Sequence, residues 1–275
     1  MRSGDADWVP PGVDTRRANV ARVYDYLLGG THNFLADQDV GRAIVAVEPN
    51  SWAIGQANRA FLGRAVRYLA GNGIRQFLDI GSGIPTQSNV HEVAQDAAPG
   101  ARVVYADIDP VAIAHSNAIL ADNPDATIIE ADLREPATAL DRAASTGLID
   151  FSQPVGLVLV AVLHFIPDEG DPWGITATLM DSLAPGSYLV ACHGTEEGAP
   201  GVAQAAEKVY NRAVSADLHM RPRADIQRFF DGLDPVDPGF VAIPYWRPDS
   251  PATTPQDPAK FWGGLAGVAR KPSVA

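Results

Sequence analysis

The chain has 275 residues, 46% of them hydrophobic and 20% charged, which is enough for one large or two small domains with a buried core. The formal net charge of −12 at pH 7 disfavours binding to a phosphate backbone, so nucleic acid is not an expected partner. One cysteine, Cys192, excludes an internal disulfide bond, and the longest apolar run (155–163) is too short to span a membrane.

Three amphipathic helices are predicted at the start of the chain. Apolar residues recur at helical spacing over residues 16–28, and Gly29-Gly30 ends this helix. A second helix follows Asp37 and ends at Pro49, and a third runs from Ser51 to the glycines at 71 and 73. We predict that residues 1–72 form a helical lid and that residues 73–275 form the core domain.

From residue 74 onward, short apolar runs alternate with helical patterns, which is typical of a parallel sheet with helices on both faces. Two late strands have no helix between them and are predicted to form an antiparallel pair at one edge. The sequence therefore predicts a mostly parallel α/β sheet of seven strands with an antiparallel last strand. The predicted strands cover residues 74–81, 102–108, 126–132, 154–163, 186–194, 240–246 and 260–271, and the clearest core helices cover 89–97, 110–120 and 176–183.

The stretch "FLDIGSGIPT" (77–86) is the strongest sign of a ligand site. A strand runs directly into Gly81 and Gly83, and a helix is predicted to start at Pro85 or Thr86. Ligands of open parallel sheets bind beyond the carboxyl ends of the strands, where glycines allow close approach of the backbone. Two glycines alone also fit an ordinary packing turn.

Acidic residues at the ends of the next two strands support a nucleoside ligand. Asp107 can accept hydrogen bonds from both ribose hydroxyls, and Asp132 with the backbone of Leu133 can read an adenine edge. Thr86 stands where a nicotinamide dinucleotide fingerprint needs its third glycine. Asp79, just before the glycines, fits a ligand that carries a positive amine.

The pattern Asp79-x-Gly81-x-Gly83, followed by Asp107 and Asp132, resembles the S-adenosylmethionine-dependent methyltransferases of the Rossmann-like class. The segments "RVYDYLLGGTHNF", "GIRQFLDIGSGIPT", "NVHEVAQ", "VLHFIPDE" and "LAPGSYLVACHG" together resemble one bacterial family of that class without an assigned substrate, over about residues 16–270. The resemblance implies S-adenosylmethionine as cofactor and S-adenosylhomocysteine as product. One departure is Pro85, which removes a backbone donor from the loop.

The predicted site combines the motif residues with candidates from the lid. Pro85 has no backbone N–H to donate to the cofactor carboxylate. Arg59 or Arg64 is expected to bind that carboxylate with its positive charge instead. An ordinary exposed position on the surface explains either arginine equally well. The predicted cofactor-binding residues are Tyr24, Asn33, Arg59, Asp79, Gly81, Ser82, Gly83, Asp107, Ile108, Asp132, Leu133 and Ala161.

Two histidines at strand ends, His164 and His193, are the candidates for a catalytic base, because imidazole titrates near neutral pH. Each also fits a role in shaping the pocket wall. His32, Asn33 and His164 are the predicted substrate contacts, with the glycine pair turning the first two inward. No residues show metal-ligand spacing, so no metal is expected.

The sequence thus predicts a cytoplasmic enzyme that transfers a methyl group to a small-molecule acceptor by in-line displacement under a lid. Neither a nucleic acid nor a membrane is an expected partner. Two alternatives remain open: a protein that binds S-adenosylmethionine or S-adenosylhomocysteine without turnover, and an NAD(P)-dependent reductase. The acceptor and the oligomeric state are not given by the sequence.

Overall fold

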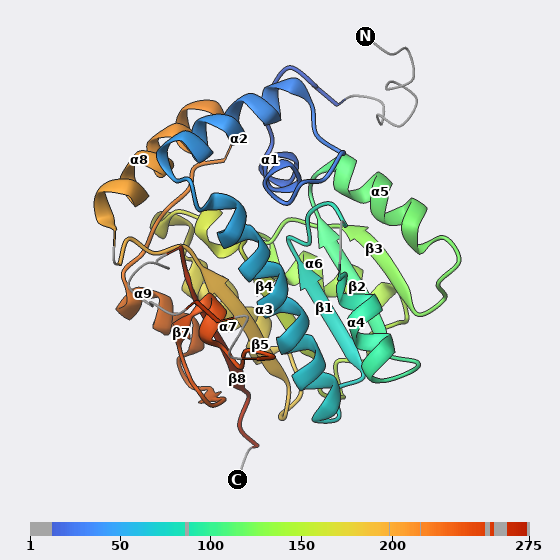
Figure 1. Cartoon of the computed structure of the whole chain (residues 1–275). Helices are drawn as coiled ribbons and strands as arrows, with labels where there is room; N and C mark the ends of the chain where they lie inside the picture. The colour runs from blue at the N-terminus through green and yellow to red at the C-terminus, as the bar shows by residue number, and fades with distance from the viewer. Residues whose placement is uncertain are drawn as a thin grey trace.

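The computed structural model describes residues 13–85, 88–197, 199–214, 216–250, 254–255 and 263–273. Within these ranges one eight-stranded sheet lies between layers of helices (Figure 1). The order across the sheet is β3-β2-β1-β4-β5-β8-β6, and β7 pairs with β8 off this path. The strands are β1 (Gln76–Ile80), β2 (Arg102–Asp107), β3 (Ala126–Glu130), β4 (Gly156–Val160), β5 (Tyr188–His193), β6 (Asp234–Pro235), β7 (Val241–Ala242) and β8 (Leu265–Arg270).

The first five strands are parallel and β8 runs antiparallel to β5, which confirms the predicted α/β sheet with a reversed last strand. The sheet has one strand more than predicted, because the short segment β6 also pairs with β8. The predicted antiparallel pairing of the two late segments is present as β7 with β8. Residues 260–262 of the last predicted strand lie outside the described residues.

The predicted strand over residues 240–246 is mostly wrong, since only Val241–Ala242 pairs and the 3-10 turn η4 (Ile243–Tyr245) follows. Pro244 has no N–H to continue a strand ladder. Arg64 holds this turn, donating from Nε to the Trp246 carbonyl (2.8 Å) and from Nη2 to the Ile243 carbonyl (3.1 Å). Arg64 is therefore a buried structural residue rather than an exposed cation or a cofactor ligand.

The three N-terminal helices lie close to their predicted positions.

No helix of the described ranges combines the length and the apolar character needed to cross a bilayer. The helices are α1 (Val20–Leu27), α2 (Leu35–Val47), α3 (Ser51–Gly71), α4 (Val90–Ala97), α5 (Pro110–Leu120), α6 (Pro136–Ser145), α7 (Pro172–Asp181), α8 (Pro200–Ala213) and α9 (Arg223–Gln227), with the 3-10 turns η1 (Leu163–Phe165), η2 (Asp168–Gly170) and η3 (Arg228–Phe230).

Two helix starts differ from prediction for local reasons. Helix α7 begins at Pro172, four residues early, because the Asp171 side chain caps it by accepting from the Gly174 N–H (3.0 Å). Pro85 is not helical, and the alternative start at Thr86 lies outside the described residues. Helix α4 begins only at Val90, after a capping box between Asn89 and Glu92.

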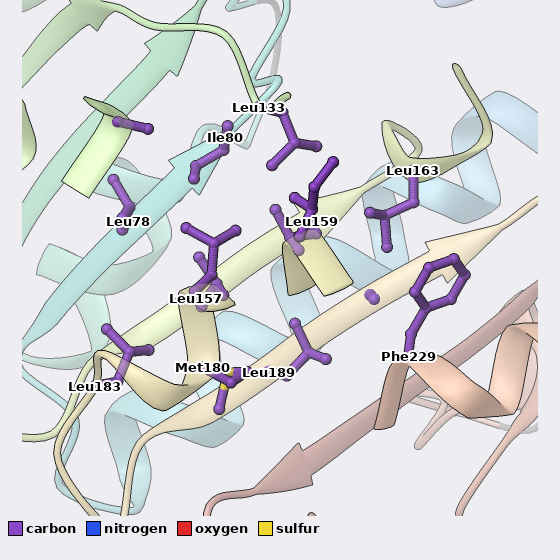
Figure 2. Packing of buried hydrophobic residues seen from close by; sticks show 14 of the residues in the cluster. Leu78, Ile80, Leu133, Leu157, Leu159, Leu163, Met180, Leu183, Leu189 and Phe229 are labelled. Carbon is purple, nitrogen blue, oxygen red and sulfur yellow. The ribbon is translucent and has the colours of Figure 1, made fainter. Parts of the chain in front are cut away.

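Side chains of the central strands alternate between two hydrophobic layers, because successive residues of a strand point to opposite faces. Leu78, Leu157 and Leu189 pack toward α6, α7 and η3 (Figure 2). Phe77 and Val158 point the other way, into a layer filled by α3 and α4. Helix α3 thus packs on the sheet itself. The predicted division of the chain at residue 72 stays a prediction.

A third hydrophobic cluster joins segments that are far apart in the chain. Val23 of α1 and Ile44 of α2 pack with Tyr210 of α8 and with Leu218 beyond it. A parallel bridge between Ala18 and Val214 continues this contact. We call α1, α2, α8 and residues 216–220 the roof, because they lie across the carboxyl end of the sheet (Figure 1).

Arg22 connects the roof to the sheet through buried ion pairs. Its Nε donates to Asp37 Oδ2 on α2 (3.0 Å), and its Nη1 lies 4.0 Å from Asp109 Oδ2, just after β2. Asp37 also accepts from the backbone N–H groups of Asn19 and Phe34. All three charged side chains are nearly inaccessible to solvent.

We expect Arg22→Met to lower the free energy of unfolding by about 3–5 kcal/mol, because it leaves two buried carboxylates without their cation. Urea denaturation followed by circular dichroism measures this change. Arg42→Met is the matched control, since Arg42 is an exposed arginine of α2 that forms its ion pair with Asp39 at the surface. It should leave the unfolding free energy nearly unchanged. Equal losses in the two variants would contradict the role given to Arg22.

Candidate active site

A cavity of about 810 Å³ opens at the carboxyl ends of the strands, beneath the roof. It joins the loop after β1 to the space between the roof and the ends of β4 and β5. Every predicted cofactor-binding residue except Asn33 lines it, and so do both predicted catalytic histidines, His164 and His193. Segments that are separate in the chain thus meet at one cavity, and the binding roles of these residues stay a prediction.

The loop after β1 forms a cradle that side chains would fill. Gly81 and Gly83 have φ angles of +73° and +66°, a conformation that favours glycine. A Cβ atom at Gly81 would lie 2.3 Å from Val162 Cγ2. The buried Ser82 Oγ has no hydrogen-bond partner among the described residues, although it lines the cavity. A hydroxyl without a hydrogen-bond partner, next to glycines whose backbone a ligand can approach, indicates that a polar ligand binds in this loop.

Asp79 is the last residue but one of β1 and lies at the base of the cradle. Burial raises the pKa of its carboxyl to about 7; the Arg59 guanidinium opposes this shift and the Asp107 carboxyl adds to it. A carboxyl with this pKa is only partly ionised at neutral pH, and a positive group beside it would favour the ionised form. This behaviour fits the ligand amine predicted from the sequence.

Asp107 ties the cradle to the end of β2. Its Oδ2 accepts from the Gly83 N–H (2.7 Å) and its Oδ1 from the Asp109 N–H (2.8 Å). Burial raises the pKa of the Asp107 carboxyl, while these two hydrogen bonds lower it. The next side chain, Ile108, is 56% exposed and lines the cavity, which gives a flat ligand an apolar face.

Asp132 and Leu133 line the cavity after β3. The Asp132 carboxylate accepts from Arg134 Nε (3.0 Å) and Nη2 (2.6 Å), and these hydrogen bonds lower the pKa of Asp132. The carboxylate is therefore fixed at the rim, and the backbone of Leu133 lies beside it. At the opposite wall, Ala161 follows β4 with a φ of +59° and lines the cavity, a backbone conformation uncommon outside glycine.

Tyr24 belongs to a hydrogen-bonded chain that the sequence did not reveal. Asn58 Nδ2 donates to the Tyr24 hydroxyl (2.8 Å), and Cys192 Sγ donates to Asn58 Oδ1 (2.8 Å). Burial raises the pKa values of both Tyr24 and Cys192 to about 12, so both groups stay protonated. Cys192 is thus a buried thiol, and Asn58 connects the roof to β5.

His32 and Asn33 do not line the cavity. The Asn33 Nδ2 group donates to Asp25 Oδ2 (2.8 Å), and the same oxygen accepts from the His32 N–H (2.8 Å). The His32 ring lies against His115 of α5, with 3.9 Å between centroids. Asp25 thus draws both residues away from the cavity, and nothing in its lining supports their predicted ligand contacts.

The two strand-end histidines are held neutral. Burial and the Arg221 cation lower the pKa of His164 to about 3. Burial and the neighbouring His164 lower the pKa of His193 well below its usual value. His193 Nδ1 donates to the Gly194 carbonyl (2.6 Å), and its Nε2 accepts from Arg221 Nη1 (2.8 Å). Both nitrogens of His193 are therefore occupied.

Arg221 is a site residue that sequence reasoning missed. It belongs to a short arginine-rich stretch (221–228), yet Arg221 is only 3% exposed. Its Nη2 donates to the Ile166 carbonyl (2.6 Å) and to Asp168 Oδ1 (2.7 Å). Arg221 thereby fixes the turn that carries His164. Across the described part of the chain, no group of three or more His, Cys, Asp or Glu side chains is placed to hold a metal ion.

Comparisons with known proteins agree with this geometry. A DUF574 family protein from Streptomyces avermitilis shares 40% identity, with 94% of this chain and 99% of that chain covered and a TM-score of 0.90. A candidate methyltransferase from Thermobifida fusca shares 38% identity over 98% of this chain and 100% of that one, again with a TM-score of 0.90. A search of curated proteins gave no match.

A more distant match shows the fold alone. The N-methyltransferase NodS from Bradyrhizobium japonicum, solved with S-adenosylhomocysteine, shares 15% identity over 86% of this chain and 98% of that one, with a TM-score of 0.50. None of the matches supports the reductase or the non-catalytic alternative. A family model described as S-adenosyl methyltransferase matches residues 6–272. The chain therefore belongs to the S-adenosyl methyltransferase family and is an enzyme that uses S-adenosylmethionine as its cofactor.

Proposed function

We propose that this enzyme methylates a small molecule that binds in the roofed half of the cavity, and that it acts in the cytoplasm. The observation that carries the proposal is the continuity of the cavity, which joins the glycine cradle to a space beneath α1, α2 and α8. A hollow covered by these helices suits a small acceptor better than a macromolecule. The formal charge of −12 also opposes a nucleic-acid acceptor.

The cradle residues suit S-adenosylmethionine. We propose that Asp79 binds the amine of its methionine part and that Asp107 accepts from the ribose hydroxyls. Ile108 would cover the adenine, whose edge faces Leu133. Arg59 lines the cavity near Asp79 and would bind the carboxylate. The remaining proposed contacts are Tyr24, Gly81, Ser82, Gly83, Asp132 and Ala161.

When bound, the cofactor supplies a methyl group on a positively charged sulfur. The chain's own contribution is to align the acceptor with that methyl group and to exclude water. The roof helices act as the proposed lid. Tyr24 and Asn58 fix its inner surface through their hydrogen bond to each other and the contact of Asn58 with Cys192.

His164 is the proposed polar contact for the acceptor. The Gly194 N–H donates to His164 Nδ1 (3.3 Å), so in the neutral ring the proton is on Nε2. We propose that this N–H donates a hydrogen bond to the acceptor. A role for His193 as the base is disfavoured, because protonation at Nε2 would place a second cation against Arg221.

The proposed acceptor class can be tested with methyl-labelled S-adenosylmethionine and a bacterial extract separated by size. We expect label to appear in the small-molecule fraction only, because the roof encloses the acceptor space. Boiled enzyme is the control. Transfer of label to protein or nucleic acid instead would contradict the proposal.

Replacing Asp107 tests the ribose contact. We expect Asp107→Ala to weaken S-adenosylhomocysteine binding by about tenfold to a hundredfold, the range expected for losing hydrogen bonds to a charged group. Isothermal titration calorimetry measures the affinity. Asp122→Ala, an exposed site in the turn after α5, is the control and should bind like the wild type. An unchanged affinity in Asp107→Ala would show that the ribose assignment is wrong.

Binding of S-adenosylhomocysteine should strengthen with pH through the titration of Asp79. The free carboxyl has a pKa of about 7, and a ligand amine favours its ionised form, so binding releases a proton. Affinity should therefore rise by about tenfold from pH 6 to pH 8. Asp79→Asn should bind more weakly at pH 8 and lose this pH dependence. A slope that persists in the variant would assign it to another group.

A further inference from the structure

The half of the cavity beneath the roof is mostly apolar. Phe165, Tyr210, Leu218 and Met220 line it together with apolar side chains of α1 and α2. The rings of Phe165 and Tyr210 lie 5.7 Å apart between centroids. An acceptor in this space therefore buries hydrocarbon or aromatic surface.

The charged side chains in this half are acidic. Glu48, Glu169 and Asp217 line the cavity there. The arginines that line it within the described residues are Arg59 and Arg134, which belong to the cofactor half, and no lysine does so. A carboxylate or phosphate on the acceptor would thus find no arginine or lysine under the roof, whereas an amine would find carboxylates.

Glu48 differs from the other two acids because it is buried, with 4% of its surface exposed. It follows the last residue of α2, and its Oε1 accepts from the Asn50 N–H (2.7 Å). Ser51 Oγ donates to the Glu48 carbonyl (2.6 Å), which fixes the backbone. No hydrogen bond or ion pair from a described residue reaches Oε2. The Glu48 carboxylate is thus held in place with one oxygen open to the cavity, where a cation or a hydrogen-bond donor would stabilise it.

We propose that Glu48 binds a protonated amine of the acceptor, so that the substrate is an apolar or aromatic molecule bearing an amine. This inference rests on the proposed function of the cavity. Ser51 and Asn58 are both on α3, about two turns or 10 Å apart along its axis. Asn58 lines the same cavity and contacts Tyr24 and Cys192. Glu48 would therefore hold the amine about that far from this hydrogen-bonded chain.

The test uses matched probes that differ only in their charged end: 4-phenylbutylamine, 4-phenylbutanol and 4-phenylbutyrate. Each is titrated by calorimetry into full-length protein saturated with S-adenosylhomocysteine. We expect the wild type to bind the amine at least tenfold more tightly than the alcohol, and the carboxylate most weakly. Glu48→Gln, which retains an oxygen for the Asn50 N–H, should bind the amine and the alcohol equally well.

Glu207→Gln is the control, because Glu207 is on α8 in the roof and does not line the cavity. It should retain the amine preference. Failure of the wild type to bind the amine, or an amine preference that survives in Glu48→Gln, overturns the anchor. The affinity for S-adenosylhomocysteine, measured first, should be equal in all three proteins. If the wild type does not bind S-adenosylhomocysteine, that result would instead count against the proposed cofactor site.

Discussion

The roof of this enzyme depends on one buried guanidinium group. Arg22 lies between Asp37 on α2 and Asp109 at the end of β2, so it joins the two roof helices to the strand edge that carries the cofactor residues. Asp109 in turn caps α5 and donates its N–H to Asp107. One connected polar network therefore sets the position of the roof and the position of Asp107, the residue proposed to bind the ribose.

Much of the cofactor half could be predicted from the sequence because its signals are local. A strand that runs into Gly81 and Gly83, and acids that follow the next two strands, occupy short windows whose meaning is set by the parallel sheet. The alternation of strands and helices was equally readable. The short segment around Pro244 was the main exception, since its pairing depends on β8 and on contacts made by Arg64.

The acceptor half could not be predicted in the same way, because the partners of its residues lie far away in the chain. The glycine pair at 29–30 correctly indicated a turn, but the direction of Asn33 is set by Asp25. Arg221 resembles a surface residue in the sequence, but in the fold the backbone carbonyls next to His164 accept its hydrogen bonds. Glu48 resembles an ordinary helix end in the sequence, but it is buried in the fold. Sequence patterns predict helices, strands and turns well, because these depend on neighbouring residues. They predict poorly which residues are buried by a segment far away in the chain.

The bridge between Ala18 and Val214 has a consequence for how the enzyme folds. About 200 residues of chain separate its two ends, so closing this contact early would cost more loop entropy than pairing neighbouring strands. The space beneath the roof is therefore closed by contacts of long sequence separation, which raise the entropy cost of folding, whereas the glycine cradle is built from segments that lie nearer to one another in the chain.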